Sequence, residues 1–323
     1  MHPSQALFQH AKPPIFLPVC DHYAGSEKLM MKSMALQNQM GPVFDLTLDC
    51  EDGAEVGQEI AQAQLISRLI ASDDNRYHRI GARVHHPGNL LFESDVQHIL
   101  EHAAAKIAYI VLPKVQNAQE VSDAIQFIQK QAQRLGRARL AIHVLIETHE
   151  ALAQVHTIAA IDEVECLSFG IMDFVSEHHG AIPAEAMRSP GQFQHPLVLR
   201  AKIEIAAACH RFGKVASHNV TTDFKQLAVV ANDAHRAAKE CGYARMWSIH
   251  PHQISAIVQS FAPQRSEIEE ASAILNAAQK NNWGPIDYQG HLHDRASYRY
   301  YWSILKKARI SGSVLPADAL HLV

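Results

Sequence analysis

Two short apolar segments of the chain each end in a carboxylate, and a helix-like segment separates them. The first is Leu145-Ile146-Glu147-Thr148, and the second runs from Leu167 to Asp173. Strand ends that lie one βα unit apart can meet in space, where two carboxylates would form a hard-oxygen site for Mg²⁺ or Mn²⁺. Spacing alone leaves a second interpretation, in which both are ordinary buried or capping carboxylates. The elements that position the two side chains decide between these interpretations.

Short β-like runs alternate with helical patterns along the first 260 or so residues. The runs cover residues 15–19, 43–49, 80–85, 109–114, 142–147, 165–169, 214–220 and 245–250. No dinucleotide-binding or P-loop glycine motif accompanies them. At this length, eight β-runs alternating with helices favour a closed (β/α)8 TIM barrel over an open doubly wound sheet.

The clearest helix follows the fourth run. Its apolar positions are Val121, Ile125, Ile128, Ala132 and Leu135, which stripe one helical face. Asn117 and Glu120 are spaced to cap its start as a capping box. A later helix is expected to have Pro196 in its first turn and to end by Gly213. Between Asp173 and that helix, residues 174–194 form an excursion that is too long for an average connection, and we expect a functional loop there.

The pattern divides the chain into a barrel over residues 1–262 and a C-terminal helical extension over residues 263–323. The extension contains helical patterns over residues 266–280 and 294–307. Its aromatic segment, residues 298–302, is expected to pack either on its own barrel or on a neighbouring subunit.

Composition excludes several classes of protein. The 323 residues are 47% hydrophobic and 19% charged with a net charge of −4, which is typical of a soluble globular protein without a nucleic-acid surface. No window is long and apolar enough for a membrane span, and no signal peptide is apparent, so we expect a cytoplasmic protein. The five cysteines lack a C-x-x-C pair, and the 22 histidines match no zinc-site spacing.

The predicted strand ends are rich in polar groups. They carry Asp49, Glu51 and Asp52; Arg83 with His85; Lys114; Glu147; Asp173; His218 with Asn219; and residues 247–250, which include His250. Any one of these could be a cap or a salt bridge. In a TIM barrel they converge on one mouth, where active sites form.

In this order, the strand-end segments resemble the HpcH/HpaI aldolase/citrate lyase family, in particular its citrate lyase beta-subunit-like and malyl-CoA lyase-like branch. The matching segments are residues 48–53 (LDCEDG), 83–85 (RVH), 112–115 (LPKV), 145–148 (LIET), 169–173 (FGIMD), 222–224 (TDF), 248–251 (SIHP) and Asp294. They cover almost the whole chain.

The resemblance implies a Mg²⁺-dependent lyase on a TIM barrel that assembles as a homotrimer or homohexamer. Glu147 and Asp173 would hold the metal, and Arg83 would donate to the substrate carboxylate or the enolate oxygen. Glu51 and Asp52 would lie beside the metal, although a capped turn also explains them. Asp294 of a neighbouring subunit would be the acid/base group. We assign Arg83, Asp49, Lys114 and His250 as substrate-binding candidates, and no Schiff-base lysine is needed.

Three segments differ from the family pattern. Residues 13–22 lack the Arg-Ser pair and Pro-Gly end that the family associates with CoA binding, His85 replaces the usual Asn, and the loop over residues 176–194 does not match.

The expected substrate is a small keto or β-hydroxy acid, as the free acid or as a CoA thioester. The expected chemistry is cleavage or formation of a carbon–carbon bond through a metal-stabilised enolate. Two alternatives remain, namely an acyl-CoA thioester hydrolase on the same barrel and a non-catalytic paralogue that binds metal or keto acid.

Overall fold

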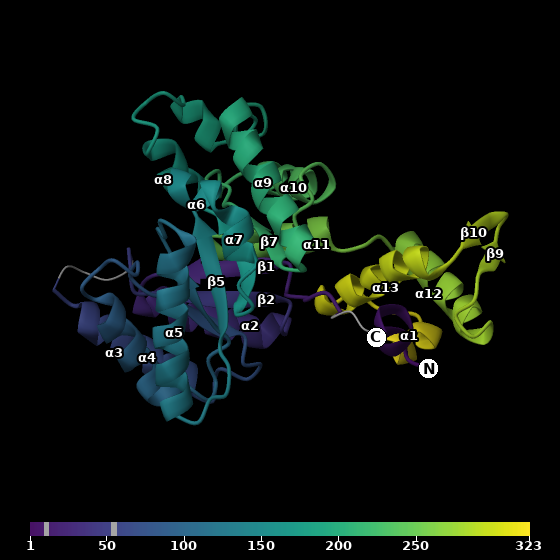
Figure 1. Cartoon of the computed structure of the whole chain (residues 1–323), viewed down its shortest axis with the longest axis horizontal. Coiled ribbons are helices and arrows are strands. Elements are labelled where there is room, and N and C mark those ends of the chain that lie inside the picture. The colour runs from purple at the N-terminus through teal and green to yellow at the C-terminus, as the bar shows by residue number, and fades with distance from the viewer. Residues whose placement is uncertain (10–12, 53–56) are drawn as a thin grey trace. The chain divides into compact units, whose positions relative to one another are not determined.

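The computed structural model describes residues 1–9, 13–52 and 57–323, which form two compact units (Figure 1). One unit is Pro18–Ser260. The other combines Met1–Leu17 with Phe261–Val323. The sequence placed the first 17 residues with the barrel, whereas the structure groups them with the tail. The reason is a shared core, described below.

The larger unit is a barrel. Among the described residues, eight parallel strands follow one another around it in chain order, and β1 pairs with β8 to close it. The strands are β1 (Cys20–Ala24), β2 (Phe44–Asp49), β3 (Ile80–Arg83), β4 (Tyr109–Leu112), β5 (Ala141–Ile146), β6 (Val164–Phe169), β7 (Val215–His218) and β8 (Arg245–Ser248). The predicted (β/α)8 TIM barrel is confirmed.

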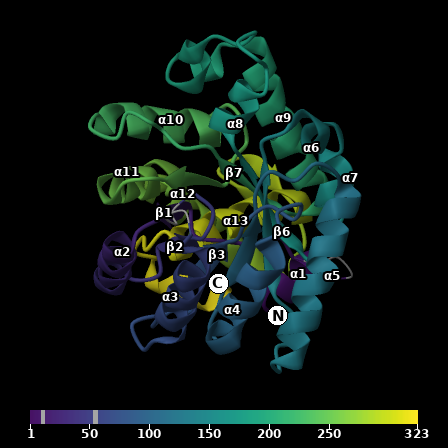
Figure 2. The same ribbon diagram turned by 90° about the vertical axis from the view of Figure 1, so that its left-hand side faces the viewer.

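Helices surround these strands (Figure 2). They are α2 (Glu27–Met40), α3 (Glu59–Ala71), α4 (Phe92–Ala103), α5 (Ala118–Arg134), α6 (His149–Ala153), α7 (Val155–Ala159), α8 (Ile171–Ser176), α9 (Pro196–Phe212), α10 (Leu227–Lys239) and α11 (Pro251–Phe261). The excursion after α8 contains two short 3₁₀ helices, η1 (Ala184–Met187) and η2 (Gly191–Phe193).

Local sequence signals explain the boundaries of two helices. Asn117 caps α5 by accepting a 2.9 Å hydrogen bond from the N–H of Glu120. The Glu120 carboxylate accepts instead from the N–H of Gln116, one residue before the expected capping-box position. Leu135 was predicted to lie on the apolar face of this helix, but it is the C-cap residue and is 48% exposed. Helix α9 begins at Pro196 and is followed by Gly213 with a left-handed φ of 66°, as the sequence predicted.

The predicted first strand, Ile15–Val19, is wrong, because the strand that closes the barrel is Cys20–Ala24. Pro18 within the predicted run has no N–H for a ladder. Strand β1 was not recognised in the sequence because it contains the polar residues Asp21 and His22, which are both buried. Of residues 13–22, only Cys20, Asp21 and His22 belong to the first strand.

Polar groups occupy part of the barrel interior. The guanidinium of Arg245 is fully buried, with its Nη2 2.9 Å from Asp45 and 3.3 Å from Asp21.

The Tyr109 ring lies so close to Gly81 that a Cβ there would be 2.7 Å from the ring Cζ, which explains a glycine in a buried strand.

The second unit has its own core. It contains α1 (Pro3–Phe8), α12 (Arg265–Lys280), β9 (Ile286–Tyr288), β10 (His291–His293), α13 (Arg295–Ile310) and a 3₁₀ helix η3 (Ala317–Leu322). Ala6, Leu7 and Phe8 are buried in one apolar cluster with residues of α12 and α13. Of the aromatic segment, Tyr298 and Trp302 are buried in this cluster, while Tyr300 is 61% exposed.

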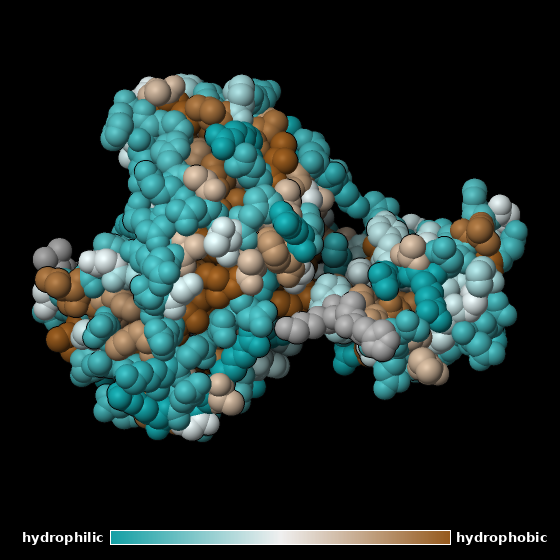
Figure 3. All heavy atoms as spheres, viewed as in Figure 1, coloured by the Kyte–Doolittle hydropathy of each residue, from teal (hydrophilic) through white to brown (hydrophobic). Residues whose placement is uncertain are grey.

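The surfaces of both units are mixed. On the face that Figure 3 shows, the barrel carries mainly hydrophilic side chains with apolar patches between them. Within the described parts of the chain, we find no helix with both the length and the apolar character needed to cross a bilayer.

Candidate active site

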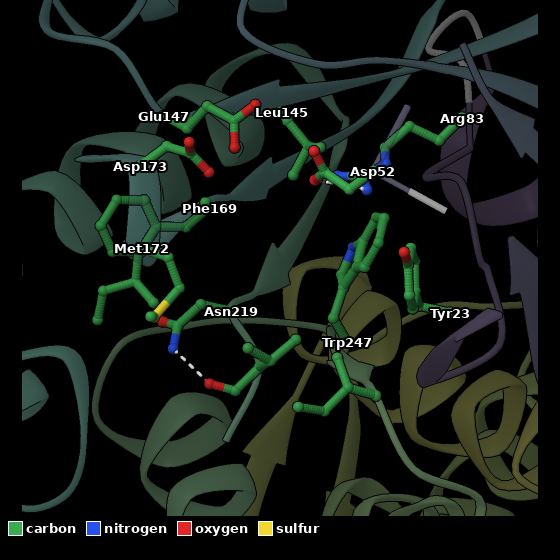
Figure 4. Close-up of a pocket in the computed structure, with 14 residues that line it drawn as sticks. Tyr23, Asp52, Arg83, Leu145, Glu147, Phe169, Met172, Asp173, Asn219 and Trp247 are labelled. Carbon is green, nitrogen blue, oxygen red and sulfur yellow. Dashed lines mark hydrogen bonds and ion pairs between the residues drawn. The ribbon is translucent and has the colours of Figure 1, made fainter. Parts of the chain in front are cut away.

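The carboxylates of Glu147 and Asp173 face one another at one edge of a cavity (Figure 4). Glu147 directly follows β5, and Asp173 lies in the first turn of α8, which begins two residues after β6 ends. The βα connection that separates them in sequence therefore brings them together in space, as predicted. Glu147 is 3% exposed, whereas Asp173 is exposed to solvent.

Backbone groups fix the position of Glu147. The N–H of Lys114, just after β4, donates a 2.7 Å hydrogen bond to Oε1 of Glu147. Lys114 has a left-handed φ of 49°, which is uncommon for a residue with a side chain. On the other side, a Cβ on Gly170 would lie 2.6 Å from the Cβ of Glu147, so only glycine fits there.

This environment penalises a charge on Glu147. Burial and the nearby charge of Asp173 raise the pKa of Glu147 to about 8, and the hydrogen bond from Lys114 and the charge of Arg83 only partly oppose the increase. Two adjacent carboxylates of this kind are stabilised by a cation between them.

Three carboxylates hold Arg83 at the end of β3. Its Nε lies 2.6 Å from Oδ1 of Asp49, and its Nη2 donates to Oδ2 of Asp49 at 2.9 Å and to Asp52 at 3.1 Å. Its Nη1 lies 3.0 Å from Oε2 of Glu51. Burial disfavours the charge of Arg83, but these carboxylates outweigh burial and raise the pKa of Arg83 well above its usual value.

The Asp49 carboxylate holds the guanidinium of Arg83 in place. It is fully buried and also accepts a 2.8 Å hydrogen bond from the Tyr23 hydroxyl. Burial opposes its ionisation, but the Arg83 and Tyr23 hydrogen bonds outweigh burial and lower the pKa of Asp49. The guanidinium carbon of Arg83 also lies 5.2 Å above the centre of the Tyr23 ring.

Lys114 pairs with the neighbouring acid. Its Nζ lies 2.8 Å from Oε1 of Glu51. Burial raises the pKa of Glu51 despite the nearby Arg83 and Lys114. For Lys114, burial works against the charge, yet the contacts with Glu51 raise its pKa.

The cavity that these groups border has a volume of about 260 Å³. Its polar lining comes from Asp52, Arg83, Glu147, Asp173 and Asn219. Its other walls are largely apolar or aromatic, namely Tyr23, Leu145, Phe169, Gly170, Ile171, Met172, Val220, Trp247 and Ile249. A small polar molecule with an apolar portion suits this lining.

The structure does not bring every predicted residue to the cavity. Asp49, Glu51 and Lys114 lie behind or beside Arg83 and are not in the lining. His250 is also outside the lining and stacks on Phe224 with ring centres 5.2 Å apart. Gly53 of the matching segment lies outside the described residues. The roles of these residues remain predictions.

Asp294 lies in the second unit, where it is the N-cap of α13. Its Oδ1 accepts from the N–H of Ala296 at 2.9 Å. Its proposed acid/base role also remains a prediction.

Sequence reasoning missed Tyr23. Its hydroxyl and ring fix Asp49 and Arg83, and it lies at the end of β1. Its position near the end of a strand could have identified it, but the first strand was predicted at residues 15–19, so Tyr23 fell outside the predicted strand.

The donor set fits a hard divalent cation. Among the described residues, no three His, Cys, Asp or Glu side chains are grouped to hold a metal. Mg²⁺ commonly binds one or two carboxylates and keeps waters or substrate oxygens in its remaining positions. Glu147 and Asp173, both acceptor-only when ionised, match that pattern.

The chain is similar to several known proteins. A crystal structure of a citrate lyase from Burkholderia xenovorans LB400 is 54% identical, covers 100% of both chains and has a TM-score of 0.86. An L-malyl-CoA/β-methylmalyl-CoA lyase of Cereibacter sphaeroides is 25% identical over 283 residues, which are 82% of this chain and 87% of the relative. The protein CitE of Mycobacterium tuberculosis, in complex with magnesium, acetoacetate and coenzyme A, shares the fold at 20% identity, with a TM-score of 0.66 over 91% of this chain and 98% of that chain.

Residues 24–251 match the HpcH/HpaI aldolase/citrate lyase family. The match confirms both the resemblance read from the strand ends and the expected enzyme class, a carbon–carbon lyase. The chain belongs to the HpcH/HpaI aldolase/citrate lyase family.

Proposed function

We propose that the protein is a Mg²⁺-dependent lyase that cleaves or forms a carbon–carbon bond in a small β-hydroxy acid or its CoA thioester. The observation that carries the proposal is the arrangement of Glu147, Asp173 and Arg83 around one cavity of about 260 Å³. The two carboxylates suit a divalent metal ion, and the guanidinium of Arg83 suits the negatively charged oxygens of a keto acid that the metal would bind.

Glu147 and Asp173 would hold Mg²⁺, with Mn²⁺ as the alternative. A bound Mg²⁺ supplies a Lewis acid that polarises the oxygens of a keto acid and stabilises negative charge that develops on them. The magnesium complex of CitE supports this choice of cofactor. The hydrogen bond from Lys114 to Oε1 keeps the Glu147 carboxylate in one orientation.

Arg83 would bind the substrate carboxylate or the enolate oxygen. A guanidinium has five N–H groups. Hydrogen bonds to Asp49 and Asp52 occupy Nε and both N–H groups of Nη2. Nη1 forms an ion pair with Glu51 but donates no hydrogen bond to it, so Nη1 keeps an N–H for a ligand. That N–H can donate to an oxygen in the cavity, where charge develops during bond cleavage. Asp49 orients the guanidinium from behind.

The acid/base step needs a group that exchanges a proton with the 3-hydroxyl or the enolate carbon. Asp294 of a neighbouring subunit is the proposed group, which requires an oligomer, and we propose a homotrimer or homohexamer. Glu51 and Asp52 would keep Arg83 and Lys114 in place beside the reacting atoms.

The five cysteines are buried free thiols, which supports a reducing, cytoplasmic location.

The free acid and the CoA thioester remain alternative substrates. The name of the L-malyl-CoA/β-methylmalyl-CoA lyase states CoA esters as its substrates, and CitE was crystallised with coenzyme A. The cavity accommodates the acid portion, while a CoA moiety would extend beyond it.

Isothermal titration tests the proposal. With Mg²⁺ present, glyoxylate, pyruvate or oxaloacetate should bind, and EDTA should abolish the binding. Additional binding of acetyl-CoA would assign a CoA-ester lyase, whereas keto-acid binding alone would assign a free acid. If no keto acid binds in a Mg²⁺-dependent manner, the proposed function is wrong. Hydrolysis of acetyl-CoA without a keto acid would indicate the thioester hydrolase instead.

A further inference from the structure

The excursion between α8 and α9 is joined to the cavity wall by buried hydrogen bonds. Gln192, in η2, is fully buried. Its Oε1 accepts from Nζ of Lys202 at 2.7 Å and from Nδ2 of Asn219 at 2.9 Å. Its Nε2 donates to Oδ2 of Asp233 at 2.9 Å. Gln192 thus connects α9 and α10 to Asn219.

These contacts determine which way the Gln192 amide points. Asp233 is fully buried and accepts hydrogen bonds from Thr221 Oγ1 at 2.6 Å and from the Ser189 hydroxyl. Because Asp233 is the acceptor, the NH₂ group of Gln192 must face it, and Oε1 must face Lys202 and Asn219. The acceptor presented to Asn219 is therefore fixed.

The Asn219 amide is fixed in turn. Both of its N–H groups are used, because Nδ2 also donates to the carbonyl of Val220 at 2.8 Å. Its Oδ1 is buried and has no hydrogen-bond partner among the described residues. Asn219 is 2% exposed and belongs to the cavity lining, beside Met172 (Figure 4). A buried acceptor without a donor is unfavourable, so a ligand that supplies the donor gains affinity.

We infer that Asn219 determines substrate specificity in this cavity by accepting a hydrogen bond from a hydroxyl or N–H group of the substrate, and that Gln192 is the positioning residue that keeps Oδ1 away from any protein donor among the described residues. The inference rests on the proposed function, since the substrate is the acid bound beside Glu147 and Asp173. A keto or carboxylate oxygen cannot satisfy Oδ1, because both atoms would be acceptors. The donor is either a hydroxyl of the acyl portion or an amide N–H of a CoA pantetheine arm.

The experiment compares ligands that differ by one donor. The two pairs are pyruvate with 3-hydroxypyruvate, and 2-oxobutyrate with 4-hydroxy-2-oxobutyrate, each titrated in Mg²⁺ and followed by acetyl-CoA. The variants are Asn219→Leu, Gln192→Leu and, as the matched control, Gln194→Leu, since Gln194 is exposed in the same loop. Thermal unfolding verifies that each variant is folded. Asn219→Leu decides the outcome if Gln192→Leu does not fold.

For a hydroxyl donor, the native protein should prefer the hydroxylated member of at least one pair by about three- to tenfold, the usual range for one hydrogen bond. Asn219→Leu and Gln192→Leu should remove this preference, and Gln194→Leu should retain it. For a pantetheine donor, the same two variants should instead weaken acetyl-CoA binding by a similar factor.

Identical ligand selectivity and acetyl-CoA affinity in the native protein and Asn219→Leu would overturn the inference, while Mg²⁺-dependent keto-acid binding would leave the proposed function standing. Absence of any Mg²⁺-dependent binding to the native protein would overturn both.

Discussion

The backbone N–H of Lys114 and Oε1 of Glu147 form a 2.7 Å hydrogen bond between the ends of two adjacent barrel strands. The bond orients the carboxylate so that it faces Asp173. A metal ligand held by main-chain geometry loses little conformational freedom when the metal binds. The predictions below concern this site and the core of the second unit.

Neutralising either carboxylate should abolish metal binding. We expect Glu147→Gln and Asp173→Asn to reduce lyase activity by about 10²- to 10³-fold, because each removes an anionic ligand while keeping the side-chain shape. Mn²⁺ titration measures the loss. Glu177→Gln, just after the same helix α8, is the control and should bind normally. Normal metal affinity in either site variant would refute the assignment.

Metal binding should release a proton at neutral pH. Glu147, with its pKa of about 8 in the metal-free protein, must lose its proton to act as a ligand. Affinity should rise by up to about tenfold per pH unit as the pH approaches 8 and level off above it. Titrations in buffers of different ionisation enthalpy count the protons. An affinity that does not change between pH 6 and 8 would contradict the prediction.

A methyl group on Gly170 should displace Glu147. The added Cβ would lie 2.6 Å from Cβ and 3.0 Å from Cδ of Glu147, and neither atom can withdraw without moving the carboxylate. We expect Gly170→Ala to weaken metal binding by roughly 10- to 100-fold, as small misplacements at catalytic sites do. In the control Gly88→Ala, the nearest atoms belong to the His86 side chain at 3.3 Å, which can move. Equal metal affinity in the two variants would count against the role of Gly170.

The buried pair of His85 and Asp95 should stabilise the fold at low pH. Nδ1 of His85 lies 2.6 Å from Oδ2 of Asp95, and this hydrogen bond raises the pKa of His85 although burial opposes it. A raised histidine pKa gives stability that is complete below the unfolded value near 6.5 and is lost as the pH rises through the folded value.

The measurement is urea unfolding of the native protein and Asp95→Asn at pH 5.5 and 8.5. The difference in unfolding free energy should be larger at pH 5.5. Asp123→Asn, on the exposed face of α5, should show no such pH dependence. A difference that is the same at both pH values would exclude a charged His85.

Helix α1 should be essential to the second unit. Leu7 is 1% exposed in the core that contains Trp283 and Trp302. We expect Leu7→Ala to destabilise this unit by about 2–5 kcal/mol, the range for a buried leucine. Leu320→Ala is the control because Leu320 is 61% exposed. Denaturation followed by tryptophan fluorescence compares the two, and equal midpoints would show that α1 is dispensable.

Local sequence patterns were sufficient for most of the barrel. Strands β2 to β8 lie within the predicted runs or within one residue of them, and Pro196 and Gly213 mark the limits of α9 because each has an intrinsic backbone preference. Strand β1 was missed because its charged residue Asp21 is buried against Arg245 of the last strand and accepts hydrogen bonds from Thr47 and Tyr109 of two other strands. No local pattern reveals a charge that is neutralised by a distant residue.

The site was predictable in its residue types but not in its contacts. The carboxylates and Arg83 could be placed at strand ends, since parallel strands end on one face. Which of them contact each other depends on side-chain conformations and on turns such as the left-handed Lys114. The sequence assigned Asp49 and Lys114 to substrate binding, which stays a prediction, but it could not show that Asp49 contacts Arg83 and that Lys114 contacts Glu51. The connection from Gln192 to Asn219 spans an irregular loop, for which sequence periodicity gives no guide.

The grouping of Met1–Leu17 with Phe261–Val323 affects the order of events during translation. Helix α1 leaves the ribosome before the barrel, but the helices that bury Ala6, Leu7 and Phe8 follow only after the entire barrel. At roughly 5–20 residues per second, this interval lasts roughly 15–60 s. During that time Ala6, Leu7 and Phe8 lack the residues of α12 and α13 that bury them in the folded protein.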